Sequence, residues 1–337
     1  MKLNAPEFWN HASGRSAAPV LRALLTPLSW IYAYATARRI AQTQPLNVGI
    51  PIICVGNATA GGTGKTPVTA HILSMLRGGG QINAHGLSRG YGGSERGPIM
   101  VTNKHSAAQV GDEPLLLARS APIWVAAGRD DGARAARAGG AQMIVMDDGH
   151  QNPLLEKTLS LLVVDAQIGF GNGRVIPAGP LREPAEAALS RTDAVILMKP
   201  YKEFKSAKSL LKQFGDLPVL SAYLAPTAPL PPGPLFAFAG IGRPNKFFDA
   251  LRRTGADVVE AIGYPDHHGY SASDLESLQA LAREYKAQLI TTEKDFVRLP
   301  AAMRQYVSVW PVKAVFEDEN SLDRLLTPLL ASARRSR

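Results

Sequence analysis

The sequence of 337 residues contains a single cysteine, Cys54. One cysteine cannot form an intrachain disulfide, and the chain has no CxxC pair and no Cys/His cluster of the kind that binds zinc. This composition fits a reducing compartment. Cys54 lies in the apolar run 50–55, where a small buried core residue is expected rather than a reactive thiol.

Acidic residues are in the minority, with 28 Asp and Glu against 37 Lys and Arg and a formal net charge of +9. A positive chain suits nucleic acid, an anionic membrane surface or a phosphorylated substrate. The sequence has no nucleic-acid-binding motif, and its arginines are not interleaved with aromatic residues that would stack on bases. We therefore expect a membrane or phosphate partner and no nucleic acid.

The apolar stretch 17–37 has no small-residue cleavage site after it, so it does not resemble a secretory signal. It is about long enough to span a bilayer, but Arg22, Pro19 and Pro27 interrupt it and a basic pair at 38–39 ends it. We prefer a helix that lies in the membrane interface. A helix packed on the protein's own core is an open alternative.

Beyond residue 45, short apolar runs alternate with helix-like segments, which is typical of an α/β fold with a mainly parallel sheet and helices on both faces. Five prolines within 225–234 predict a linker. We therefore expect an N-terminal membrane-associated helix at 1–45, a nucleotide-binding core at 46–224 and a smaller C-terminal α/β domain at 235–330.

The expected strands of the core are 48–55, 82–87, 99–102, 123–127, 142–146, 159–164 and 194–198, with helices that begin near Gly64, Glu113 and Asp130 and a further helix at 205–214. The expected elements of the smaller domain are strands 235–239, 258–262 and 288–292 and helices 244–253 and 272–285.

A glycine-rich run leads from the first of these strands into a helix, which is the context that a P-loop NTPase-like fold requires. We expect its residues to bind the nucleotide: Thr59, Ala60, Gly61, Gly62, Thr63, Gly64, Lys65 and Thr66. Its glycines allow backbone N–H groups to turn toward phosphate oxygens, Lys65 can reach the β- and γ-phosphates, and Thr66 can bind Mg²⁺. The usual pattern GxxxxGK[ST] has glycine where this chain has Thr59.

Magnesium also needs a carboxylate at the end of a neighbouring strand. Asp147 and Asp148 follow one apolar run, and Asp165 follows another. Paired acids followed by Gly-His-Gln favour Asp147 and Asp148 as metal ligands, although spacing alone does not exclude Asp165.

Transfer to an alcohol further requires a group that receives the hydroxyl proton. Asp112 and Glu113 can supply it, although such residues are more often found in the first turn of a helix for structural reasons. His267 and His268 can tune such a carboxylate, although histidines in a turn are usually only polar loop residues. Residues alone leave these roles open.

Eight short motifs resemble, in order along nearly the whole chain, those of the tetraacyldisaccharide 4′-kinase family of lipid A biosynthesis. They are Gly56-Asn57 with 59–67, SRGYGG at 88–93, GDEP at 111–114, DDGHQ at 147–151, PLREP at 180–184, GIGRP at 240–244, DHH at 266–268 and TTEKD at 291–295. Each motif is short, but chance does not explain their joint order. We assign no chemistry to 291–295.

This resemblance implies an ATP-dependent kinase that uses Mg²⁺ to phosphorylate the 4′-hydroxyl of a tetraacylated glucosamine disaccharide 1-phosphate. It places the protein, which we expect to be a monomer, at the cytoplasmic face of the Gram-negative inner membrane. It implies that Asp112 is the base and is paired with His267. The other implied roles are magnesium and nucleotide binding by Asp147, Asp148 and Glu183, lining of the site by Arg89 and Tyr91, and phosphate contact by Arg129, with Arg134 as the alternative.

Two other classes share part of this pattern. A P-loop ATPase that switches membrane binding would carry its signature lysine at Ala60, so the alanine counts against that class. A membrane adaptor without catalysis would leave the paired acids without a purpose.

Overall fold

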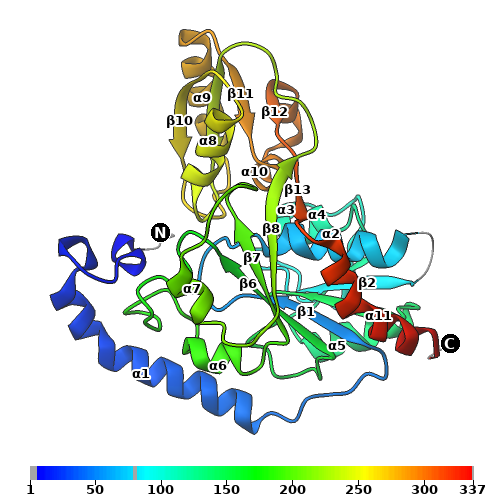
Figure 1. Cartoon of the computed structure of the whole chain (residues 1–337). Helices are drawn as coiled ribbons and strands as arrows, with labels where there is room; N and C mark the ends of the chain where they lie inside the picture. The colour runs from blue at the N-terminus through cyan, green and yellow to red at the C-terminus, as the bar shows by residue number, and fades with distance from the viewer. Residues whose placement is uncertain (1–5, 79–81, 336–337) are drawn as a thin grey trace.

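The structure is a computed structural model that describes residues 6–78 and 82–335, arranged as a core with a smaller domain above it (Figure 1). The core sheet has nine strands in the order β13-β8-β7-β6-β1-β5-β2-β4-β3. Its strands are β1 (Ile52–Gly56), β2 (Ala84–Ser88), β3 (Ile99–Met100), β4 (Ile123–Val125), β5 (Met143–Asp147), β6 (Leu159–Asp165), β7 (Ala194–Lys199), β8 (Val219–Pro226) and β13 (Val312–Phe316). The pairs β3–β4 and β13–β8 at the two edges are antiparallel, and the other pairs are parallel. The prediction of a mainly parallel sheet is confirmed.

Alternating residues of β1 divide the core into two layers. Ile53 and Val55 pack on the face covered by helices 65–77 (α2) and 319–335 (α11). Ile52 and Cys54 pack on the other face, against the alanines of helix 129–138 (α5). The helices of the core are α2 (Lys65–Arg77), α3 (Ala107–Val110), α4 (Asp112–Leu117), α5 (Arg129–Ala138), α6 (Ala185–Leu189), α7 (Lys208–Lys212) and α11 (Glu319–Arg335). Burial raises the pKa of the Cys54 thiol to about 11, as expected for an inert core cysteine.

The smaller domain is a four-stranded parallel sheet in the order β10-β9-β11-β12. Its elements are β9 (Leu235–Ala239), α8 (Pro244–Arg253), β10 (Val258–Gly263), α9 (Ala272–Glu284), β11 (Gln288–Thr291), α10 (Glu293–Arg298), the 3₁₀ helix η4 (Ala301–Tyr306) and β12 (Val307–Val309). Phe236 and Phe238 pack on one face with Leu275 and Leu278 of α9. The domain therefore has a hydrophobic core of its own.

The predicted end of the smaller domain at residue 330 is wrong. After β12 the chain returns to the core, where β13 pairs with β8 and Leu322, Leu326 and Leu329 of α11 join the main hydrophobic cluster. Because β8 ends at Pro226, the linker itself is shorter than 225–234. Two connections therefore join the domains, from β8 to β9 and from β12 to β13, and both meet the core at the end of the pair where Val312 lies beside Pro226.

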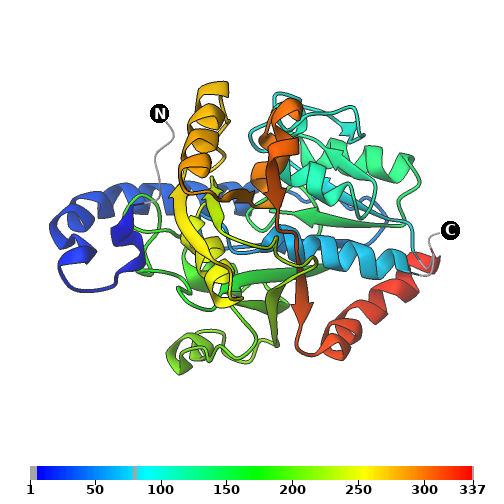
Figure 2. The same cartoon turned by 90° about the horizontal axis from the view of Figure 1, so that it is seen from above.

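The N-terminal helix α1 (Pro19–Gln42) follows two 3₁₀ helices, η1 (Glu7–Asn10) and η2 (Arg15–Ala17), and runs along the core at the end opposite α11 (Figures 1 and 2). Small side chains face the core, because Ser29 and Thr36 are its buried residues and the Ser29 hydroxyl donates to the Val175 carbonyl at 2.7 Å. No described helix combines the length and apolar character needed to cross a bilayer.

Candidate active site

The glycine-rich loop leaves the carboxyl end of β1 between the ends of β5 and β6. Gly61 and Gly64 have φ angles of 108° and 91°, which side chains with a Cβ disfavour. Gly64 caps the start of α2, so the unpaired N–H groups and the positive end of the helix dipole face the loop. The Asn57 amide donates to the Thr59 carbonyl at 2.7 Å and holds the turn. The loop thus has the geometry of an anion site.

Lys65 lies at the first position of α2 and is buried, with an exposed fraction of 8%. Its Nζ is 3.6 Å from Oδ1 of Asp148, and the Arg182 guanidinium donates to the same oxygen at 2.8 Å. Burial would raise the pKa of Asp148, but Lys65 and Arg182 outweigh it and hold the pKa well below its usual range. Asp148 has a left-handed φ of 53°, a conformation that functional sites often retain.

Asp147 ends β5 and is buried beside the loop. Its Oδ1 accepts a hydrogen bond from Thr69 at 3.0 Å, whereas its Oδ2 is buried without a partner. Burial, and then the Glu113 carboxylate, raise the pKa of Asp147. A buried carboxylate oxygen without a donor is well suited to a cation.

These oxygens fit a nucleotide-linked magnesium. Mg²⁺ in such sites takes one or two carboxylates and completes its shell with phosphates and water. The predicted ligands Asp147, Asp148 and the Thr66 hydroxyl are of this chemical type. The described residues contain no cluster of three or more His, Cys, Asp or Glu that would hold a metal alone. Asp165 is less suited, because Arg243, which precedes α8, and Lys246 of α8 already neutralise its buried carboxylate.

The structure brings Asp112 and His267 together across the two domains. Asp112 begins α4, and its Oδ2 lies 3.2 Å from Nδ1 of His267, which sits in the turn after β10. The Tyr91 ring packs edge-on against the His267 ring at 5.1 Å. His268 points to another partner, Asp274, at 3.1 Å. Of the two histidines, His267 is therefore the one that contacts the candidate base.

The protonation state of Asp112 follows from its neighbours. Burial alone would raise its pKa, but the hydrogen bond from His267 and the charges of Arg298 and Lys294 hold the pKa well below its usual range. Burial would raise the pKa of Glu113, but its ion pair with Lys294 at 2.5 Å and the charge of Lys65 lower it. The start of α4 therefore faces the phosphate-binding loop.

The predicted phosphate-contacting arginine is buried at this edge of the sheet. An Arg129 Nη2 group donates to the main-chain oxygen of Asp147 at 3.2 Å, and its Nε is buried without a partner. Arg134, the alternative, is exposed and pairs with Asp130 and Asp131 on its own helix, which leaves Arg129 as the better candidate. Arg89 is exposed near Arg129.

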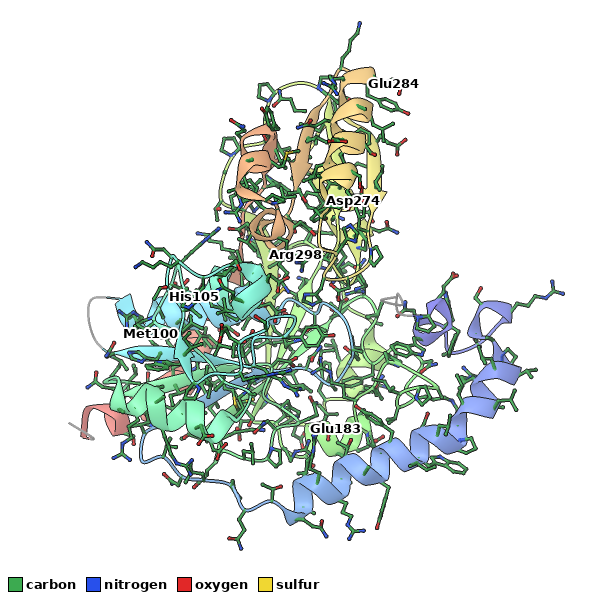
Figure 3. All side chains as sticks on the ribbon, turned by 180° about the vertical axis from the view of Figure 1, so that it is seen from behind. Met100, His105, Glu183, Asp274, Glu284 and Arg298 are labelled. Atoms are coloured by element: carbon green, nitrogen blue, oxygen red, sulfur yellow. The ribbon has the colours of Figure 1, made fainter. Side chains whose placement is uncertain are left out.

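Glu183 contacts the glycine-rich loop only indirectly, through Gln151. Its carboxylate accepts hydrogen bonds from Arg191 at 2.5 Å and Gln151 at 3.0 Å, and Gln151 also donates to the Asn57 carbonyl. Figure 3 shows Glu183 close to α1. Its position indicates support of the loop through Gln151 and Asn57, and a direct contact with nucleotide stays a prediction.

Two charged residues at the site were missed by sequence reasoning. Arg182 contacts Asp148, and Arg298 contacts Asp112. Arg182 stands next to Glu183 in the PLREP motif, so the motif held a signal for it. Arg298 lies three residues beyond the TTEKD motif, and no spacing relates it to Asp112.

Comparison with known proteins identifies the family. A model of the tetraacyldisaccharide-1-P 4′-kinase family matches residues 21–331. The chain is 53% identical over 332 residues to the tetraacyldisaccharide 4′-kinase of Caulobacter vibrioides (97% of this chain, 98% of that protein) and 49% identical over 337 residues to that of Hyphomonas neptunium (98% and 99%). The crystal structure of the "apo" form of LpxK from Aquifex aeolicus in complex with ATP superposes with a TM-score of 0.72 at 25% identity, covering 92% of this chain and 99% of that one. This chain therefore belongs to the tetraacyldisaccharide 4′-kinase family, whose members are kinases with an alcohol as acceptor.

Proposed function

We propose that the protein transfers the γ-phosphoryl group of ATP to the 4′-hydroxyl of a tetraacylated glucosamine disaccharide 1-phosphate, a precursor of lipid A. Family membership supports the reaction, and one observation carries it to this chain: a buried carboxylate paired with histidine, Asp112 with His267, on a helix that faces the glycine-rich loop. A nucleotide-binding protein without an acceptor does not need such a pair.

In this proposal the loop and the start of α2 bind the phosphates, and Lys65 neutralises charge that develops on the transferring group. Asp147, Asp148 and Thr66 would hold Mg²⁺, which when bound would neutralise phosphate charge. Asp112 receives the acceptor proton, and His267 orients it. The transfer is direct and in line, without a phosphoenzyme.

The test is transfer of labelled γ-phosphate from ATP to the disaccharide lipid in detergent, with Asp112→Ala beside the parent. We expect the parent to phosphorylate the lipid and the variant to lose that activity. ATP hydrolysis without lipid phosphorylation would instead favour a switch ATPase, and no nucleotide turnover would favour an adaptor. A trapped phosphoenzyme would overturn the direct transfer.

We further propose that α1 seats the protein, as a monomer, on the cytoplasmic face of the inner membrane. Large apolar side chains of α1 point to solvent, at exposed fractions of 41–74%: Val20, Leu21, Leu24, Leu28, Trp30, Ile31, Tyr32 and Tyr34. The charged residues of the helix are Arg22, Arg38 and Arg39, all cationic. An outward apolar face with basic residues suits an anionic lipid interface.

Replacing Leu24 and Trp30 together by glutamate tests this seat. Each exposed side chain is expected to gain about 1.5–3 kcal/mol on burial in the interface, so the double variant should bind anionic vesicles at least about tenfold more weakly in a flotation assay. Leu211→Glu, at an exposed leucine of α7, is the matched control and should float like the parent. Equal flotation of both variants would exclude α1 as the seat.

A further inference from the structure

The segment that leads into α10 has no role in the mechanism above. This segment is the TTEKD motif at 291–295, which runs from the last residue of β11 into the first turn of α10. Helix α10 of the smaller domain lies against α4 of the core, and Figure 3 places Arg298 at this junction. Three ion pairs cross it: Glu293 with Arg119, Lys294 with Glu113, and Arg298 with Asp112.

Asp295 organises the end of the motif. It is fully buried, and its Oδ1 accepts hydrogen bonds from the Gly240 N–H and the Tyr270 hydroxyl, each at 2.8 Å. The Arg298 guanidinium also donates to Oδ1 of Asp295 at 3.1 Å and to the Gly240 carbonyl at 2.6 Å. A buried carboxylate that accepts several hydrogen bonds is held rigidly. Asp295 and the Gly240 carbonyl therefore fix the orientation of the Arg298 guanidinium through its Nη1 group.

The Nε and Nη2 groups of Arg298 contact the candidate base, Asp112, and both meet the same carboxylate oxygen, Oδ2. The Arg298 Nε donates to Oδ2 of Asp112 at 2.7 Å, its Nη2 contacts the same oxygen, and His267 approaches that oxygen too. The other oxygen, Oδ1, accepts from the Glu113 N–H at 2.8 Å. Because a carboxylate oxygen has two lone pairs, Oδ1 keeps one acceptor site.

We propose that Arg298, anchored by Asp295, is a positioning residue for phosphoryl transfer: it holds Asp112 through Oδ2 and leaves Oδ1 to receive the acceptor proton. This inference rests on the proposed kinase function. The proton passes from the sugar hydroxyl to Oδ1 as the oxygen attacks the γ-phosphorus and the bond to the β-phosphate oxygen breaks. Because Arg298 belongs to the smaller domain, the base is complete only when that domain is seated on the core.

A merely structural clasp is the competing explanation, and the neighbouring ion pairs give the contrast. Arg119, in the turn that follows α4, pairs with Glu293 of α10 at 2.6 Å and is exposed, so this pair crosses the same junction away from Asp112. If α10 acts only as a clasp, loss of the Arg119 pair and loss of Arg298 should both weaken docking of the domain and differ only in degree. Positioning of the base predicts an effect that belongs to Arg298 alone.

The pH profile provides that distinctive readout. Asp112 faces Arg298 and Lys294 of α10, His267 and Asp266 of the turn after β10, and Glu113 of its own helix. Without Arg298, burial would be opposed mainly by His267 and Lys294, so the carboxylate would take up a proton at higher pH. In a plot of kcat against pH, the fall of kcat at low pH, here called the acidic limb, should move to higher pH by about 1–3 units in Arg298→Gln.

The experiment compares the parent with Arg298→Gln, Arg298→Lys and Arg119→Gln in the lipid kinase assay. We expect Arg298→Gln to lower kcat on the order of 10²-fold, with the KM for ATP little changed and the acidic limb displaced. Arg298→Lys should restore part of the rate and return the limb toward the parent, since it keeps the charge. Arg119→Gln should keep the parental limb.

Several outcomes would overturn the inference: parental kcat in Arg298→Gln, an unshifted acidic limb, or equal losses in Arg298→Gln and Arg119→Gln. If Arg298→Gln does not fold, Arg298→Lys decides through its rate instead. A lysine keeps the charge but cannot reproduce both contacts with Oδ2, so its kcat should stay below that of the parent, and a parental kcat would overturn the inference. A parent that does not phosphorylate the glycolipid would reject the proposed function instead, so the two failures are distinguishable.

Discussion

Lys65→Ala is expected to lower kcat for lipid phosphorylation on the order of 10²–10³-fold. The lysine is buried at the start of α2, beside the glycine-rich loop and 3.6 Å from Asp148. In low dielectric surroundings its charge acts strongly on phosphate oxygens, and alanine removes that charge without refilling the space. Initial-rate kinetics with saturating ATP and lipid measure the loss.

Lys208→Ala, at an exposed lysine of α7, is the matched control and should retain the parental kcat. Asp148 keeps Arg182 as a partner at 2.8 Å in Lys65→Ala, so the variant should fold, which thermal unfolding can check. Full kcat in a folded Lys65→Ala protein would remove Lys65 from the mechanism.

Residues whose role depends on local sequence were predictable. The glycine-rich loop joins β1 to α2 within about a dozen residues, and the starts of α2, α4 and α5 fall within one residue of their predicted positions. Hydrophobic periodicity, turn residues and helix caps act over such distances, so they can be recognised in one sequence. The same holds for Asp147, which ends β5, and for Asp148, which follows it.

Contacts between distant residues were not predictable from spacing. The Arg298 side chain reaches Asp112 across 186 positions of sequence, and the strand β13 returns to the core after an inserted domain. The apolar pattern of 312–316 is compatible with a strand in either sheet. The alternation of apolar residues identifies a strand but does not show which strand it pairs with. For this reason the end of the smaller domain was misplaced, and Arg298 had no signal at all.

The N-terminal helix shows a related limit. Its hydrophobic residues alone did not decide between a membrane surface and the protein's own core. The structure separates them, because Ser29 and Thr36 face inward while Leu24 and Trp30 face solvent. Which side of an apolar helix meets the core depends on its neighbours, here the loop that carries Val175.

Asp112→Asn is expected to reduce kcat by about 10²–10⁴-fold, because an amide cannot receive the acceptor proton. The substitution keeps the size of the side chain and an oxygen that can accept from Arg298, so the acceptor pocket should keep its shape. The KM for ATP should change little, since the contacts that Asp112 makes among the described residues are with Arg298, His267 and the Glu113 N–H rather than with the glycine-rich loop. Rate measurements at saturating lipid against pH would establish the loss.

Stability separates this catalytic loss from a folding defect. The pKa of Asp112 is lowered in the folded protein, so its ionised form stabilises the fold above the unfolded pKa of about 4, and that contribution disappears as the pH falls through and below this value. The difference in Tm between parent and Asp112→Asn should therefore shrink on acidification. The rate defect should persist at neutral pH, where the parent is fully ionised and Arg298 in the variant still has Asp295 as a counter-charge. A variant that matches the parent in kcat while showing this change in Tm would make Asp112 a structural anion, and the proton would then need another acceptor.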